Sequence, residues 1–322
     1  MNFSIERHIR LACLVLACAL PTAAAFAQTP LRVVLPVSAG SGVDTIVRAI
    51  QPALARAFGQ PVAIENMPGA GGVIGTAAIV KAAPDGNTIG VVSTNHVINP
   101  HVFKSMPFES IHDITPISVL GGTPLVLLVN PKVPAKNARE LVEFLKAKPG
   151  AYHYASSGNG TVIHLAGAMF AEEASVDVRH IPYKGVGPML IDLIGGQVEF
   201  GVVALPAVQG HLKSGALRAI GMTGKTRAPA APDIPTIAEQ GLPGYEVTAW
   251  FAVIGPAKLP AEQVKRIHSA FVAAFATPEV KEAMDKQGNS INPTTPEVAA
   301  QFFRSELARY GALVRKLGLK PE

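Results

Sequence analysis

A strand, a glycine-containing loop and a helix follow one another twice in this chain, and this repeat constrains the fold more than any other feature. In the first copy, residues 31–35 are apolar and rich in the β-branched side chains that suit a buried strand. Residues 36–42 contain two glycines and two serines, and apolar residues from Val43 to Phe58 then recur with helical spacing. Asp44 is a candidate N-cap for this helix.

The second copy lies later in the chain. A strand-like run at residues 152–155 leads into a glycine- and serine-rich loop at 156–161. A helical apolar pattern begins at Val162, and Thr161 is its expected N-cap. The second copy therefore predicts another helix N-terminus at the end of a strand.

The strands that follow each loop also correspond. Residues 62–66 in the first half parallel residues 178–182 in the second half, and residues 88–93 parallel residues 200–205. Two βαβαβ halves of this kind predict an α/β fold with two doubly wound lobes, whose loops face one cleft.

Residues 1–27 are predicted to be a signal peptide rather than part of the fold. Arg7 and Arg10 form a basic start, residues 11–20 are apolar but too short to span a membrane, and Ala25-Phe26-Ala27 is a cleavage signal. We therefore expect a periplasmic protein that begins at Gln28. Both cysteines lie in the signal, so disulfides and cysteine-based zinc or redox sites are excluded from the mature chain.

The composition disfavours several classes of function. The formal net charge is +5, which suits anionic small ligands, but the sequence has no lysine- and arginine-rich run of the kind that binds nucleic acid. The histidines are scattered without metal-ligand spacing, and no Walker A, H-E-x-x-H or G-x-S-x-G pattern occurs. We expect no nucleic acid, no metal and no cofactor.

The chain is predicted to pass between the lobes twice. Apolar runs at residues 114–120 and 125–129 flank a Gly-Gly-Thr-Pro segment that we interpret as the first crossing, and residues 247–254 form the return crossing. Helices after residue 263 are expected to cover the first lobe. The predicted division gives residues 28–123 and 246–322 to the first lobe, and 124–245 to the second.

The two glycine- and serine-containing loops are the candidate ligand site. Each helix start presents unpaired N–H groups and a partial positive charge, which together favour an anion. The glycines would let the backbone approach a ligand closely. Lys184 follows a predicted strand and is either a cation in the cleft or a partner in a surface ion pair.

The two loops allow two other interpretations. The loop nearly matches the dinucleotide-binding fingerprint, but Thr45 stands where the third glycine allows close packing of helix and strand, which argues against a dinucleotide. The alternative function is a periplasmic hydrolase that uses a serine in the cleft. Its candidates are Ser41, Ser156 or Ser157 as nucleophile, His164 as base and Asp44 as the orienting group.

The motifs together resemble a known family. They include Pro36-x-x-Ala39-Gly40-x-Gly42-x-Asp44, Glu65-Asn66-x-Pro68-Gly69-Ala70-Gly71-Gly72-x-Ile74-Gly75, Tyr154-x-Ser156-x-Gly158-x-Gly160-Thr161-x-x-His164-Leu165 and Pro182-Tyr183-Lys184-Gly185. The chain resembles the Bug family, the periplasmic receptors of tripartite tricarboxylate transporters. The resemblance extends over nearly the whole mature chain.

The resemblance implies a type II periplasmic-binding-protein fold, with two lobes joined by two crossing strands. It also implies a receptor, not an enzyme, that captures a small organic carboxylate and delivers it to membrane subunits of the transporter. The ligand could be a dicarboxylate, a tricarboxylate, an amino acid or an aromatic acid, and we expect a monomer. The implied ligand-binding residues are Ser38, Ala39, Gly40, Ser41, Gly42, Thr94, Asn95, Ser156, Ser157, Gly158, Asn159, Gly160, Thr161, Lys184, Ala204 and Leu205.

Overall fold

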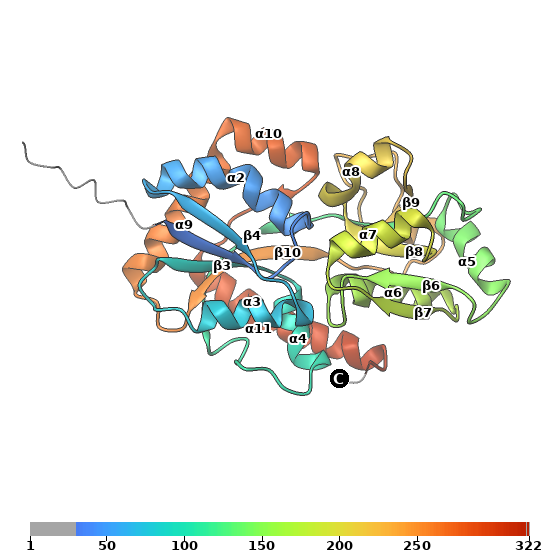
Figure 1. Ribbon diagram of the computed structural model, residues 1–322, viewed down its shortest axis with the longest axis horizontal. Helices are drawn as coiled ribbons and strands as arrows, with labels where there is room; N and C mark the ends of the chain where they lie inside the picture. The colour runs from blue at the N-terminus through green and yellow to red at the C-terminus, as the bar shows by residue number, and fades with distance from the viewer. Residues whose placement is uncertain (1–29, 320, 322) are drawn as a thin grey trace, which may run out of the picture.

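The computed structural model describes residues 30–319 and residue 321, so the predicted signal peptide at residues 1–27 lies outside the described residues. Within the described part, the strands form two sheets that lie side by side, and each sheet carries its own helices (Figure 1). The two-lobe α/β architecture expected from the repeat is therefore confirmed.

The first sheet combines three parallel strands with antiparallel strands along one side. Its members are β1 (Leu31–Leu35), β2 (Val62–Asn66), β3 (Thr88–Ser93), β4 (Ile114–Thr123), β10 (Ala249–Pro256) and β11 (Ser290–Ile291). Their order is β11-β4-β10-β3-β1-β2. β1 pairs in parallel with β2 and β3, and β10 is antiparallel to both β3 and β4.

Helices cover both faces of the first sheet, because its strands are apolar on both sides. The helices are α2 (Gly42–Phe58), α3 (Val73–Val80), α4 (Asn95–Val102), α9 (Ala261–Ala276), α10 (Pro278–Gln287) and α11 (Pro296–Lys316). Leu31, Val33 and Leu35 share a buried cluster with α2 and α9, whereas Val34 shares one with α3 and α11. In Figure 1, α2 and α10 accordingly lie above the sheet, and α3 and α11 lie below it.

The second sheet repeats the arrangement of the first. It consists of β5 (Leu125–Val129), β6 (His153–Ser156), β7 (Arg179–Pro182), β8 (Phe200–Ala204) and β9 (Arg218–Met222), in the order β7-β6-β8-β5-β9. Its helices are α5 (Ala138–Lys146), α6 (Val162–Ala174), α7 (Val186–Gly195) and α8 (Leu205–Lys213). β6 lies between β7 and β8 just as β1 lies between β2 and β3, so the strand correspondences expected from the sequence are confirmed.

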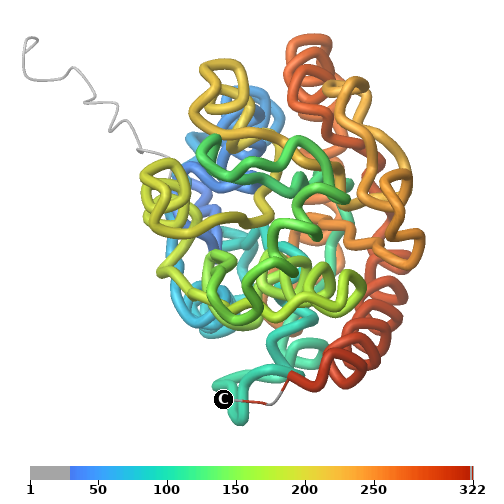
Figure 2. Tube along the Cα trace, turned by 90° about the vertical axis from the view of Figure 1, so that its right-hand side faces the viewer, coloured from blue at the N-terminus to red at the C-terminus, as the bar shows by residue number. Residues whose placement is uncertain are grey.

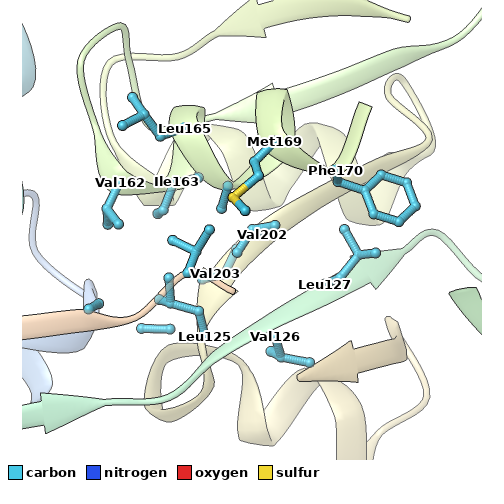
Figure 3. Packing of buried hydrophobic residues seen from close by; sticks show 14 of the residues in the cluster. Leu125, Val126, Leu127, Val162, Ile163, Leu165, Met169, Phe170, Val202 and Val203 are labelled. Carbon is cyan, nitrogen blue, oxygen red and sulfur yellow. The ribbon is translucent and has the colours of Figure 1, made fainter. Parts of the chain in front are cut away.

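The core of the second lobe is built by α6 and the strands beside it. Met169 and Phe170 of α6 pack over Val202 of β8 and Leu127 of β5 (Figure 3). All of these side chains are buried. This packing fixes the position of α6, and thus of its N-terminus at the loop after β6.

The chain passes between the sheets at two neighbouring places. Pro124 separates β4 from β5, and its carbonyl accepts a hydrogen bond from the Leu205 amide at 2.9 Å. On the return, the Val247 amide still donates to Thr223 of the second lobe at 2.9 Å, and β10 then begins in the first sheet. The two crossings are neighbours, because Ala249 at the start of β10 pairs with Thr123 at the end of β4.

The last long helix connects the two lobes away from these crossings. α11 lies beside α4 and β4 of the first lobe, and it follows one edge of the view onto the second lobe in Figure 2. Near its end, Lys316 forms an ion pair with Glu173 of α6 at 3.1 Å. No helix in the described ranges is both long and apolar enough to cross a membrane.

Candidate functional site

A cavity of about 310 Å³ lies between the lobes, and its walls are loops at the ends of strands from both sheets. Loops after β1 and before α3 supply the first wall, and loops after β6 and β7 supply the second. Of the residues predicted from the sequence, those that line the cavity are Ser38, Ser41, Gly42, Asn95, Ser157, Gly158, Asn159, Thr161, Lys184 and Ala204. The two repeated loops thus meet across one space, as the sequence predicted.

The other predicted residues do not line the cavity, and some of their polar groups bond to neighbouring protein atoms. They are Ala39, Gly40, Thr94, Ser156, Gly160 and Leu205. The Leu205 amide, for example, is bonded to the Pro124 carbonyl. Thr94 is fully buried, and its hydroxyl accepts a hydrogen bond from the Trp250 amide at 2.9 Å. Thr94 therefore joins β10 to the end of β3 in this structure.

The N-terminus of α2 reaches the cavity from the first lobe. Ser41 is its N-cap, since its hydroxyl accepts a hydrogen bond from the Asp44 amide at 3.4 Å. The prediction that Asp44 caps this helix is therefore wrong, because Asp44 lies within the first turn. Its buried carboxylate instead accepts hydrogen bonds from the Gly40 amide, Arg48 and Asn66. These bonds hold the loop and leave Asp44 outside the cavity lining.

The N-terminus of α6 reaches the cavity from the second lobe. Thr161 is its N-cap, as predicted, and accepts a hydrogen bond from the His164 amide at 3.1 Å. The Thr161 hydroxyl also donates to the Gly158 carbonyl at 2.8 Å. This second bond fixes the loop after β6 against the helix it precedes.

Three amides at these helix starts remain available to a ligand. The N–H groups of Gly42 and Val43 in α2, and of Ile163 in α6, have no hydrogen-bond partner among the residues that the structure describes. All three residues line the cavity. Unsatisfied amides at two helix N-termini favour a negatively charged group.

Side chains of the first lobe also bond to helix starts of the second. Asn95 Oδ1 accepts a hydrogen bond from the Val162 amide of α6 at 2.8 Å. Ser38 Oγ accepts one from the Val186 amide of α7 at 3.1 Å. The lobes are therefore in direct contact around the cavity.

Glycines allow this close contact between the lobes. A Cβ atom on Gly42 would lie 2.6 Å from Cβ of Ala204, and one on Gly185 would lie 2.8 Å from Cβ and Oγ of Ser38. A Cβ on Gly160 would lie 2.4 Å from the side chain of Val102 in α4. Each pair joins opposite lobes, so any side chain at these glycines would push the lobes apart.

The cavity is nearly free of charged side chains. Among the described residues that line it, only Lys184 is charged, and Lys184 is exposed to solvent. The remaining lining residues are glycines, small polar residues and apolar residues such as Val37, Phe103 and Leu125. In the described part of the chain, no group of three His, Cys, Asp or Glu side chains could hold a metal ion.

The serine and histidine near the cavity do not form the arrangement considered for a hydrolase. Ser156 is fully buried and bonds to His180 Nε2 at 2.6 Å, rather than to His164. The His180 ring stacks on His164, with 4.0 Å between the ring centroids. Asp44 lies in the other lobe with its carboxylate already bonded, so it does not orient either histidine.

Protonation of two histidines should destabilise the fold in acid. Burial lowers the pKa of His96 from 6.5 to about 4, and burial together with the His164 ring lowers that of His180 to about 3. Because the unfolded chain binds these protons more tightly, we expect the free energy of unfolding to fall as the pH drops from about 6.5 towards 4. Urea unfolding at pH 7 and pH 5 would measure this fall. In a His180→Phe variant, the free energy of unfolding should fall less between pH 7 and pH 5 than in wild type. An equal fall in both proteins would show that protonation of His180 does not cause it.

Sequence reasoning missed the contribution of the loop before α3 and of two aromatic residues. Gly71 and Gly72 line the cavity, as do Phe103 and Tyr183. The glycine-rich motif around Gly71 was a visible signal, because it also opens a helix after a strand. Phe103 follows α4 without any motif, so no local pattern indicated its position.

The chain is similar to proteins of one transporter family. A family model described as "Tripartite tricarboxylate transporter family receptor" matches residues 46–319 of the chain. The chain is also similar to Protein BugT of Bordetella pertussis, with 33% identity over 90% of this chain and 90% of BugT.

Several solved structures are similar to this structure over most of the length of the chain. Periplasmic binding protein BugD has 29% identity and a TM-score of 0.88, over 92% of this chain and 99% of BugD. An R. palustris protein solved with adipate has 28% identity and a TM-score of 0.88, over 92% of this chain and 100% of that protein. MatC from Rhodopseudomonas palustris with bound malate has 29% identity and a TM-score of 0.83, over 88% of this chain and 98% of MatC. The expected periplasmic-binding-protein fold is confirmed.

Proposed function

Because the chain belongs to the tripartite tricarboxylate transporter receptor family, we propose that it captures a small organic carboxylate between its lobes and delivers it to the membrane subunits of such a transporter. The family and its structural relatives are periplasmic solute-binding proteins, not enzymes. We further propose that this chain is exported to the periplasm and acts there as a monomer.

The observation that carries the proposal is the convergence of two helix N-termini on an almost uncharged cavity. The free amides of Gly42, Val43 and Ile163 supply hydrogen-bond donors for carboxylate oxygens. Lys184 supplies a positive charge at the surface of the same cavity. A carboxylate held mainly by backbone amides can also leave, as release to a transporter requires.

The relatives support carboxylates as the ligand class. One related structure was solved with adipate and another with malate, and both are dicarboxylates. We propose that the ligand-binding residues of this chain are those predicted residues that line its cavity, other than Ser38 and Asn95, whose side chains bond to the opposite lobe. We also propose that the lobes consist of residues 28–123 with 246–322, and of residues 124–245.

A thermal-shift screen would test the proposal. Protein freed of any carried ligand would be mixed with mono-, di- and tricarboxylates, amino acids and aromatic acids. A bound ligand raises the unfolding temperature, because it stabilises only the folded state. Stabilisation by at least one carboxylate, recovered with unchanged mass, is expected. A screen in which no carboxylate stabilises the protein would contradict the proposal.

Lys184 provides a prediction within this function. Replacing Lys184 with glutamine should weaken carboxylate binding about fivefold, because an exposed charge contact contributes up to about 1 kcal/mol. The loss should shrink as salt is added, since salt screens exposed charges. Calorimetric titration would measure it, with Lys213→Gln at the end of α8 as control. Equal affinities for the two variants would show that Lys184 contributes no specific contact.

A further inference from the structure

Two polar side chains that the family resemblance implies in ligand binding are already bonded to the opposite lobe. Ser38 in the first lobe accepts a hydrogen bond from the Val186 amide, at 3.1 Å. Asn95, also in the first lobe, accepts one from the Val162 amide, at 2.8 Å. Both donors are the first residues of helices in the second lobe, α7 and α6.

The two helices depend on these bonds because their own N-caps leave the amides unpaired. In α6, the Thr161 hydroxyl accepts from the third residue, His164, and not from Val162. In α7, the N-cap is Gly185, which has no side chain to offer. The first-turn amides of a helix need partners from outside the helix, and here the other lobe supplies them.

The surrounding backbone is shaped for this contact. Gly185 lies against Ser38 so closely that a Cβ would stand 2.8 Å from its Cβ and Oγ. A Cβ on Gly160, two residues before Val162, would lie 2.4 Å from the side chain of Val102 and 3.2 Å from that of Phe103, both in the first lobe. Absence of side chains at both glycines brings each helix start within hydrogen-bond reach of its partner.

We propose that Ser38 and Asn95 are positioning residues that cap α7 and α6 across the cleft and thereby favour the closed form of the receptor, with or without a ligand. The bonds join protein atoms only, so they stabilise closure by the same amount for every ligand. Their effect on affinity rests on the proposed function, whereas their effect on the ligand-free shape does not. Separation of the lobes would break both bonds and return the two amides to water.

The test uses Ser38→Ala, Asn95→Ala and the double variant, with Asn137→Ala as the matched control. Asn137 caps α5 within the second lobe through a bond from the Glu140 amide at 2.9 Å, so its loss removes a cap without touching the cleft. Loss of one cap should change the equilibrium between the closed and open forms about fivefold, and loss of both caps should change it about twenty-five-fold.

Small-angle scattering of the ligand-free proteins would give the first readout. The radius of gyration should increase in the double variant, and the control should match wild type. Calorimetric titration with two chemically different carboxylates would give the second readout. Each cap variant should lose affinity by the same factor for both ligands, because closure rather than ligand contact has changed.

The outcomes separate this proposal from the proposed function. An unchanged radius of gyration in the double variant would overturn the cross-lobe caps. Loss of affinity for one carboxylate and not for the other would also overturn them, because it would identify direct ligand contacts. If the radius of gyration increases in the variants but wild type binds no carboxylate, the proposal of cross-lobe caps is supported and the proposed carboxylate function is contradicted.

Discussion

Replacing Gly42 with alanine is expected to weaken carboxylate binding about fivefold to a hundredfold while the first lobe stays folded. Gly42 is the first residue of α2, and its backbone conformation is one that alanine can adopt. The added Cβ would, however, lie 2.6 Å from Cβ of Ala204 in the other lobe. Inserting a methyl group into a closely packed contact costs about 1–3 kcal/mol. The lobes would therefore be held apart near their crossing points.

A second substitution provides the control for this effect. Ala204→Gly removes the atom that the new methyl group would meet, so the double variant Gly42→Ala with Ala204→Gly should regain most of the lost affinity. Calorimetric titration of the wild type, both single variants and the double variant gives the full cycle. Full affinity in Gly42→Ala, or no recovery in the double variant, would show that this contact does not control closure.

Replacing Gly185 with alanine should reduce both stability and affinity, with a combined effect larger than that of a single lost cap. Gly185 has φ +115° and ψ 177°, a backbone conformation that is essentially restricted to glycine. Its new Cβ would also lie 2.8 Å from Cβ and Oγ of Ser38, and would displace the acceptor of the Val186 amide. We expect about 1–3 kcal/mol of destabilisation from backbone strain, measured by urea unfolding without ligand.

Gly187 is the matched control for that variant. It lies two residues further along, within α7, and a Cβ added there would meet nothing within 4 Å. Gly187→Ala should therefore leave affinity unchanged and slightly increase stability, because alanine suits a helix better than glycine. If Gly185→Ala behaves like Gly187→Ala, the strain and the contact with Ser38 are both unimportant.

Local patterns were sufficient to predict the framework of both lobes. The strand-like runs and helical spacing around the two loops became β1 with α2 and β6 with α6, because alternation and helical periodicity report on burial within one element. Thr161 was recognised as an N-cap for the same reason, since the capping bond spans only a few residues. The repeat itself predicted that the two loops would meet.

The start of α2 was misplaced because two residues fit the same local rule. Ser41 and Asp44 are both common N-cap residues, and the apolar spacing begins only at Val43. The combination of serine with an acidic residue three positions later is typical of a capping box, in which the serine is the cap. This signature would have placed the helix start at Gly42, where the structure has it.

The role of the glycines could not be read from the sequence. Their repetition predicted close approach of the backbone to a ligand, whereas Gly42, Gly160 and Gly185 closely approach the opposite lobe. The partner of Gly42 is Ala204, which is far away in the chain, and no local pattern records such a contact. Gly158 has φ +126°, a backbone conformation that favours glycine.

Two polar residues at strand ends were assigned to ligand binding although they bond to other parts of the protein, and such contacts between distant residues also leave no local pattern. Thr94 follows β3 and Ser156 ends β6, and the family resemblance implied that both bind the ligand. Instead, Thr94 bonds to the Trp250 amide and Ser156 bonds to His180. Buried polar groups need partners, and tertiary structure decides whether a neighbouring strand or a ligand provides them.

The crystal structure of the protein with a carboxylate identified by the thermal-shift screen tests the central claim most directly. The account predicts one ligand between the lobes, with carboxylate oxygens within hydrogen-bond distance of the amides of Gly42, Val43 or Ile163, and with the Ser38 and Asn95 caps in place. A carboxylate bound outside this cavity, or bound inside it without contact to any of these amides, would contradict the account.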